Sequence, residues 1–178
     1  MAFIRQKRMG RHRHYQVVRN YREEGKHKQE TLCHLGRYSS LEEAIDEVSK
    51  EVRRTEEKAA ESRERSQEAK EHLLDTYGAE LGYKIPSKDE VLPRWRDLCY
   101  ERQWEYRLAD SYSLDGEAKE HRQAEWITEC RMYEALFTYH TLLDLAVDYD
   151  KMASVNRMRL NKLVAISQKY FYSGLQCS

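Results

Sequence analysis

Residues 13–37 read RHYQVVRNYREEGKHKQETLCHLGR, and this stretch decides the fold of the N-terminal part of the chain. Residues 15–21 are rich in β-branched and aromatic side chains, which favours a strand. Residues 28–35 are a second strand candidate, although apolar and polar side chains alternate less regularly there. Between the two, Gly25 can adopt the left-handed conformation that a short hairpin loop requires. We therefore expect a β-hairpin.

A further strand is expected before this hairpin. Residues 3–8 have strand character, and Met9-Gly10-Arg11 is typical of a turn. The dipeptide Leu35-Gly36 closes the segment. Residues 1–38 are thus predicted to form a three-stranded antiparallel β-meander.

This segment is strongly basic. Residues 1–38 hold ten Lys or Arg, three Asp or Glu and four His, whereas the whole chain of 178 residues has a net charge of zero. Such asymmetry between segments is typical of an arm that binds a polyanion. We interpret the meander as a surface for nucleic acid.

A long helix is predicted over residues 39–78. A serine followed three residues later by Glu43 is a capping-box signature, and Gly78 offers a C-terminal stop. Steps of alternately four and three residues give an uncharged stripe: Leu41, Ile45, Val48, Val52, Thr55, Ala59, Ser62, Ser66, Ala69 and Leu73. Such a coiled-coil-like stripe packs against a partner, either a second copy, in a homodimer through residues 41–73, or helices of the same chain. A mostly solvated helical stalk is the other interpretation.

The remainder is predicted to be a linker, residues 79–92, followed by a C-terminal helical bundle, residues 93–178. We expect helices from Pro93 to a break at residues 113–116, over residues 117–147, and over residues 151–172. The fold class is α+β, mainly α.

The last two of these helices differ in charge. Residues 117–150 carry eight acids and three bases, and residues 151–178 carry five bases and no acid. Packing of the two helices on each other explains this pattern. A second DNA contact through the basic helix is the alternative.

Strand alternation divides the candidate contact residues between two faces. Gln16, Val18 and Asn20 share one face of their strand and residues 13, 15, 17, 19 and 21 share the other, and the sequence leaves open which face is exposed. Amide side chains suit adenine, and arginine and lysine suit phosphates. The predicted DNA-contacting residues are Arg5, Lys7, Arg8, Arg11, Arg13, Gln16, Arg19, Asn20, Arg22, Lys26, Lys28 and Gln29.

The meander resembles the N-terminal segment of bacterial insertion-sequence transposases of the acidic-triad class. Those proteins have a YREGGKxRQ…LG segment, and residues 21–29 here read YREEGKHKQ, followed by Leu35-Gly36. The resemblance covers residues 1–45 and implies a DNA-end-binding arm. The rest of the chain matches no pattern of that family, because it is too short and too helical for a ribonuclease-H-like core.

We therefore expect no catalytic residues and no enzyme activity. The chain has no phosphate-cradling glycine loop and no nucleophile elbow. The residues His12, His14, His27, Cys33 and His34 lack a recognised zinc spacing, so we expect no metal and no cofactor.

The leading hypothesis is a non-catalytic protein that binds duplex DNA and is mobile-element-associated or regulatory. One alternative is an adaptor acting through its helices, with a protein partner of the C-terminal bundle, and another is RNA binding. No run approaches the roughly 20 apolar residues of a membrane span. We expect a cytoplasmic protein, nucleoid-associated if it binds DNA.

Overall fold

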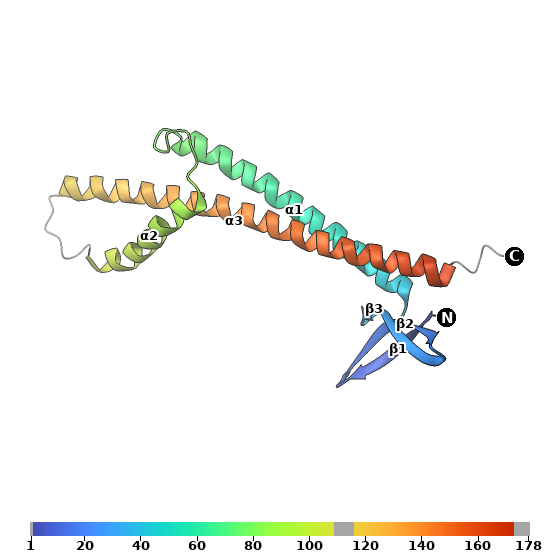
Figure 1. Ribbon diagram of the computed structural model, residues 1–178. Helices are drawn as coiled ribbons and strands as arrows, with labels where there is room; N and C mark the ends of the chain where they lie inside the picture. Colours follow the sequence, from blue (N-terminus) through green and yellow to red (C-terminus); the bar gives the residue numbers. More distant parts are fainter. Residues whose placement is uncertain (1, 109–115, 173–178) are drawn as a thin grey trace. The chain divides into compact units, whose positions relative to one another are not determined.

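The computed structural model describes residues 2–108 and 116–172, and for residues 9 and 102–123 it describes no side chains. The described elements are β1 (Ala2–Met9), β2 (His12–Glu23), β3 (Lys26–Gly36), α1 (Leu41–Tyr77), α2 (Lys88–Leu108), α3 (Gly116–Ser167) and the π-helical turn η1 (Gln168–Tyr172) (Figure 1). The predicted α+β class, mainly α, is confirmed. Contacts divide the chain into a sheet unit, Met1–Lys58 with Tyr149–Ser178, and a helical unit, Ala59–Asp148.

The predicted β-meander is confirmed. The strands are antiparallel in the order β1-β2-β3. Met9 pairs with His12 across one loop, in which Gly10 has a φ of 61°. In the next loop both Glu24 (φ 51°) and Gly25 (φ 78°) are left-handed, as a type I′ hairpin turn requires.

Two β-bulges explain why the alternation in β3 is irregular. Cys33 pairs with Val17 and Thr31 pairs with Val18, so Leu32 is an extra residue between them. A second register shift makes Leu35 an extra residue in the same way. Because a bulge re-aims side chains, three nearly consecutive residues, Leu32, Cys33 and Leu35, can all face the core.

The core of the sheet unit joins one face of the sheet to both long helices. Val17 and Leu35 of the sheet are fully buried, and with them lie Leu41 of α1 and Leu163 and Ile166 of α3. Ile4, Tyr15 and Leu32 pack partly buried around this cluster. The end of α3 is therefore part of what holds the meander in place.

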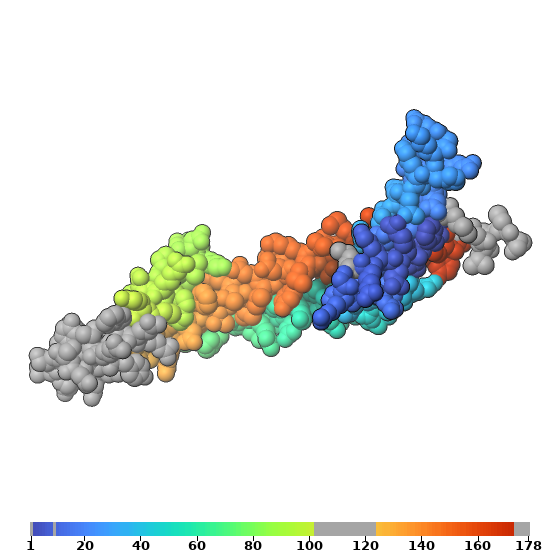
Figure 2. All heavy atoms as spheres, turned by 90° about the horizontal axis from the view of Figure 1, so that it is seen from below, coloured from blue at the N-terminus to red at the C-terminus, as the bar shows by residue number. Residues whose placement is uncertain are grey.

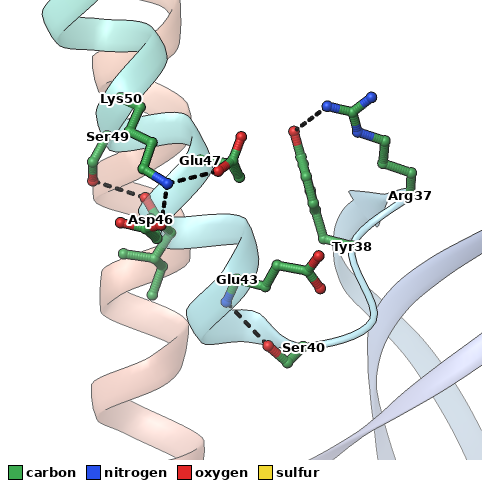
Figure 3. A network of polar contacts seen from close by, with 9 residues as sticks. Arg37, Tyr38, Ser40, Glu43, Asp46, Glu47, Ser49 and Lys50 are labelled. Atoms are coloured by element: carbon green, nitrogen blue, oxygen red, sulfur yellow. Dashed lines mark hydrogen bonds and ion pairs between the residues drawn. The ribbon is translucent and has the colours of Figure 1, made fainter.

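The predicted capping box at the start of α1 is present (Figure 3). Ser40 Oγ accepts a hydrogen bond from Glu43 N at 3.0 Å. The Glu43 carboxylate in turn accepts from Ser39 N, also at 3.0 Å. One turn later Lys50 bridges Asp46 at 2.7 Å and Glu47 at 2.9 Å. The sheet thus passes into a well-capped helix.

The uncharged stripe of α1 is buried in the single chain. Each of its residues is buried or half-buried. In the sheet unit Leu41 and Val48 share a core with Leu163 of α3, and in the helical unit Leu73 packs with Leu136 of α3. The partner of the stripe is thus the same chain. These contacts accord with packing inside one chain, and the homodimer through residues 41–73 stays a prediction.

Two helix bounds in the C-terminal part differ from the prediction. The helix α2 begins at Lys88 rather than Pro93, because Ser87 and Glu90 form another capping box, with Ser87 N donating to Glu90 at 2.6 Å. The helix α3 continues through residues 148–150, where a break was expected. Its acidic and basic parts therefore cannot pack on each other. Of the break expected at residues 113–116, residues 113–115 lie outside the described part of the chain.

The helical unit has a core and an ion-pair cluster of its own. Leu73, Val91 and Leu136 are almost fully buried. Arg94 of α2 donates to both Glu129 oxygens of α3 at 2.8 Å. This bidentate hydrogen bonding lowers the pKa of Glu129. It joins α2 to α3 in a defined geometry.

Candidate nucleic-acid interface

The strand pairing assigns each side chain of the sheet to one of two faces, because residues directly opposite each other share a face. The inner face includes Ile4, Arg8, Arg13, Tyr15, Val17, Arg19, Tyr21, Glu23, Lys26, Lys28, Glu30 and Cys33. The outer face includes Phe3, Arg5, Lys7, His12, His14, Gln16, Val18, Asn20, Arg22, His27, Gln29, Thr31 and His34.

The structure decides which face meets solvent. Val17 lies in the core with α1 and α3, so its face is the inner one. The face with Gln16, Val18 and Asn20 is turned away from this core. Figure 2 shows the strands, in shades of blue, at the surface of the molecule. Val18 of the outer face is also fully buried, so the assignment rests on the packing of Val17 with residues of α1 and α3 and not on burial alone.

The outer face carries positive charge without negative charge from the sheet. Arg5, Lys7 and Arg22 lie on it, together with the four histidines of the segment. All seven side chains are exposed. The three acids of residues 1–38 lie elsewhere, Glu23 and Glu30 on the inner face and Glu24 in a loop.

Two of the inner-face cations are compensated by acids of the same sheet. Arg19 bridges Glu30 at 2.6 Å and donates to the Tyr170 hydroxyl at 3.4 Å. The hydrogen bond to Glu30 raises the pKa of the Arg19 guanidinium. Lys28 forms an ion pair with Glu23 at 2.5 Å. These charges are compensated by neighbours in the same unit.

A polar network crosses all three strands on the outer face. With the Gln16 amide turned to satisfy its hydrogen bonds, Arg5 Nε donates to Gln16 at 2.8 Å. Arg5 also donates to Gln29, and Gln29 Nε2 donates to Asn20 Oδ1 at 2.9 Å. Two neutral amides thus hold the guanidinium of Arg5 without neutralising it, and Asn20 in turn positions Gln29.

A second cation is held in a similar way at the far end of β2. Arg22 donates to His27 Nε2 from Nε at 3.2 Å and from Nη2 at 3.0 Å. This partner is also uncharged when the imidazole accepts. Both arginines of the outer face are therefore oriented by neutral groups and keep their charge for an external anion.

The twelve predicted contact residues are distributed unevenly. Six of them lie on the outer face: Arg5, Lys7, Gln16, Asn20, Arg22 and Gln29. Arg8, Arg11 and Arg13 gather at the exposed tip of the β1–β2 hairpin. Lys26 and Lys28 are exposed on the inner face beyond the core, where Arg19 is half-buried. Gln16 is 6% exposed and has little surface left for a ligand.

Metal sites and membrane-spanning helices are two further features to consider among the described residues. Among them, no three His, Cys, Asp or Glu side chains are grouped as ligands for a metal ion. In the same part of the chain, no helix is both long enough and apolar enough to cross a membrane.

Comparison with known proteins identifies the N-terminal segment. Comparisons with curated proteins and with solved structures give no match. Residues 3–69, which span the sheet and most of α1, match the model of the IS1634 family transposase, N-terminal domain. The resemblance to a transposase N-terminal segment is thereby confirmed and extends further into α1 than residue 45. The sheet and most of α1 are therefore similar to the N-terminal domain of IS1634 family transposases.

Proposed function

We propose that this protein binds duplex DNA through the outer face of its sheet and acts without catalysis in a mobile-element setting. The observation that carries the proposal is the separation of charge between the two faces. Arg5, Lys7 and Arg22 stand on a face to which the sheet contributes no carboxylate. The match of residues 3–69 to a transposase N-terminal domain supports the setting.

The dimensions of a β-ribbon suit this role. Neighbouring strands lie about 4.8 Å apart, and a two-stranded ribbon fits the major groove, which is about 12 Å wide. The β1–β2 hairpin is such a ribbon, and its tip carries Arg8, Arg11 and Arg13. We assign phosphate contacts to these arginines and to Lys7 and Arg22. Asn20 and Gln29, which are exposed, are the amides available for base edges.

Duplex DNA is favoured over single-stranded RNA. A sheet that binds single strands stacks bases on exposed aromatic side chains. Tyr15 and Tyr21 of β2 lie on the inner face and are half-buried, and Arg19 covers the ring of Tyr21 at 5.4 Å. The tyrosines of β2 are therefore not available on the outer face, where the exposed rings are those of Phe3 and the four histidines.

The proposed mechanism is positional. Cations on the outer face and at the hairpin tip displace counterions from the DNA backbone, and this release drives binding. The contact of the inner face with α1 and α3 fixes the sheet on the helices. A partner that holds the helices would thereby be held at DNA.

A salt titration tests the proposal. We expect the wild-type protein to bind a duplex with an affinity that falls steeply as the salt concentration rises, by about 0.9 in log–log slope for each phosphate contacted. Affinity that is micromolar or weaker at low salt, with no dependence on salt, would refute it. A competing single-stranded RNA that displaces the duplex at equal concentration would instead support the RNA alternative.

Substitutions are better probes here than removal of residues 1–38. Val17 and Leu35 are fully buried in the core that they share with α1 and α3. Deleting the meander would expose Leu41 and Leu163 to water and disturb the helices. Loss of DNA binding in such a deletion would then have two explanations.

A further inference from the structure

A groove of about 390 Å³ lies beside the edge strand of the sheet. The strand β3 contributes Thr31, Cys33 and His34 to its lining, and α3 contributes Arg159, Lys162 and Leu163. All of these residues belong to the sheet unit. Because β3 is the last strand in the order β1-β2-β3, the groove adjoins the free edge of the sheet.

Two cations at this groove lack a compensating charge. Arg159 and Lys162 are exposed and lie one turn apart on α3. Among the residues that the structure describes, neither makes a hydrogen bond or an ion pair. Their neighbour Arg157, in contrast, is paired with Glu56 of α1. The sequence from residue 151 to residue 172 contains no acid, so α3 itself offers them no partner.

The field of these two cations reaches into the groove. Burial raises the pKa of the Cys33 thiol, whereas a backbone hydrogen bond at Val17 and the charges of Lys162 and Arg159 act in the opposite direction. Cys33 is only 7% exposed, so the charges of Arg159 and Lys162 act on a buried group that lines the groove. An anion at this place would interact with both cations.

The groove also continues the outer face. Thr31 pairs with Val18, and His34 pairs with Gln16, because Leu32 and Leu35 are bulge residues. Thr31 and His34 therefore lie on the outer face. The Thr31 hydroxyl and the His34 imidazole thus belong both to the outer face and to the lining of the groove, and both side chains are exposed. Both groups can donate a hydrogen bond to a phosphate oxygen.

We propose that this groove binds one phosphate of the DNA backbone and that the end of α3 is a second part of the DNA interface. The inference rests on the proposed function of the outer face and extends it across the edge of β3. Arg159 and Lys162 neutralise the phosphate, and Thr31 donates a hydrogen bond to it. The basic end of α3, which does not pack on the acidic part of the same helix, thereby has a role.

The test compares two double variants that each lose one arginine and one lysine. Arg159→Gln/Lys162→Gln removes the groove cations, and Arg53→Gln/Lys70→Gln removes two exposed cations of α1 that do not line the groove. For the groove variant we expect about tenfold weaker duplex binding near 0.1 M salt and a salt slope lower by about 1, the effect of one phosphate. The α1 variant should bind like wild type. Circular dichroism would check that both variants fold.

The outcomes separate this inference from the proposed function. If wild type itself shows no salt-dependent duplex binding, the proposed function fails. If wild type binds and the groove variant matches the α1 variant in affinity and slope, the groove proposal alone is overturned. Arg159→Lys/Lys162→Arg, which keeps both charges, should restore most of the affinity.

A second probe, inorganic phosphate, distinguishes a backbone phosphate from a free one. The ring signals of His34 report on the groove in nuclear magnetic resonance spectra. If inorganic phosphate shifts them in wild type but not in the groove variant, while the two proteins bind duplex equally, the groove is a site for free phosphate. That result would overturn the DNA contact.

Discussion

The two faces of the sheet differ in how they use their cations, of which the inner face carries five Lys or Arg and the outer face three. On the inner face Arg19 and Lys28 are paired with Glu30 and Glu23 of the same sheet. On the outer face Arg5 is held by neutral amides. A charge compensated within the protein contributes little to binding an external anion, whereas one oriented by neutral groups remains available.

The net charge of residues 1–38 is a poor guide to which part of their surface binds an anion. Residues 1–38 are basic as a whole, but the sheet separates acids from the outer face by strand alternation alone. A shift of one residue in register would exchange the two faces. The position of Val17 in the core therefore fixes which cations lie on the face without carboxylates.

The largest expected effect is a loss of stability when a core side chain behind the inner face is truncated. Leu35→Ala should lower the free energy of unfolding by about 2–5 kcal/mol, because Leu35 is fully buried and its removal leaves a cavity. Urea unfolding followed by circular dichroism measures this. At Thr31 on the outer face, Thr31→Ala serves as the control and should change stability far less. Equal losses in both variants would contradict the assignment of the faces.

Breaking the outer face should act on DNA and not on folding. Lys7 lies opposite His14 of β2, and His14 and Arg22 are about 26 Å apart along that strand. Lys7 and Arg22 therefore contact different phosphates. Lys7→Gln/Arg22→Gln should therefore weaken duplex binding about a hundredfold near 0.1 M salt and lower the salt slope by about 2. Fluorescence anisotropy over a range of salt concentrations measures both.

The control for that variant is again Arg53→Gln/Lys70→Gln, which loses the same two residue types. If both double variants weaken binding equally, the effect is one of net charge. The outer face would then have no special role.

Much of the N-terminal fold could be predicted because its signals are local. Gly25 marks a tight hairpin, and the spacing of Ser40 and Glu43 marks the start of α1. The uncharged stripe indicated a packed helix face, but a stripe does not say which helix covers it. That choice depends on tertiary contacts with Leu163 and Leu136, which are far away in sequence.

The errors in the C-terminal part have physical causes. Separate helices are expected over residues 117–147 and 151–172, yet residues 117–173 contain no glycine or proline that would interrupt α3. Pro93 predicts a helix start, but the capping box of Ser87 and Glu90 starts α2 five residues earlier, at Lys88.

Half of the predicted contact residues lie on the outer face. Strand alternation divides the residues of β2 between two faces, but which face packs on the helices depends on the contacts of Val17 with α1 and α3. The sequence shows Arg159 and Lys162 only as two of the bases of a helix and does not place them beside β3. Their place beside β3 follows from the packing of Leu163 in the core.

A smaller effect should follow from placing an acid on the outer face. Asn20→Asp keeps the shape of the side chain and still accepts the hydrogen bond from Gln29. The added negative charge should weaken duplex binding about five- to tenfold at low salt, with the loss shrinking as salt rises. Asn20→Ala is the control, because it removes the amide without adding charge. If both substitutions weaken binding equally, the amide contact matters and the charge does not.

The smallest effect is expected from removing an acid on the inner face. Glu30→Gln changes charge by the same amount as Asn20→Asp but frees Arg19 from its ion pair. Because this pair is half-exposed, the midpoint of thermal unfolding should fall only slightly. Duplex affinity should change less than in Asn20→Asp, as measured in the same assay. A larger change would show that Arg19 contacts DNA directly.

The histidine ring signals test the central claim most directly. His12, His14, His27 and His34 all lie on the outer face, whereas His72 and His140 lie in the helical unit. In nuclear magnetic resonance spectra, a short duplex added at low salt should shift the ring signals of the four outer-face histidines, and added salt should reverse the shifts. The signals of His72 and His140 should stay in place. Shifts at His72 or His140 with the outer-face signals unchanged would contradict the account.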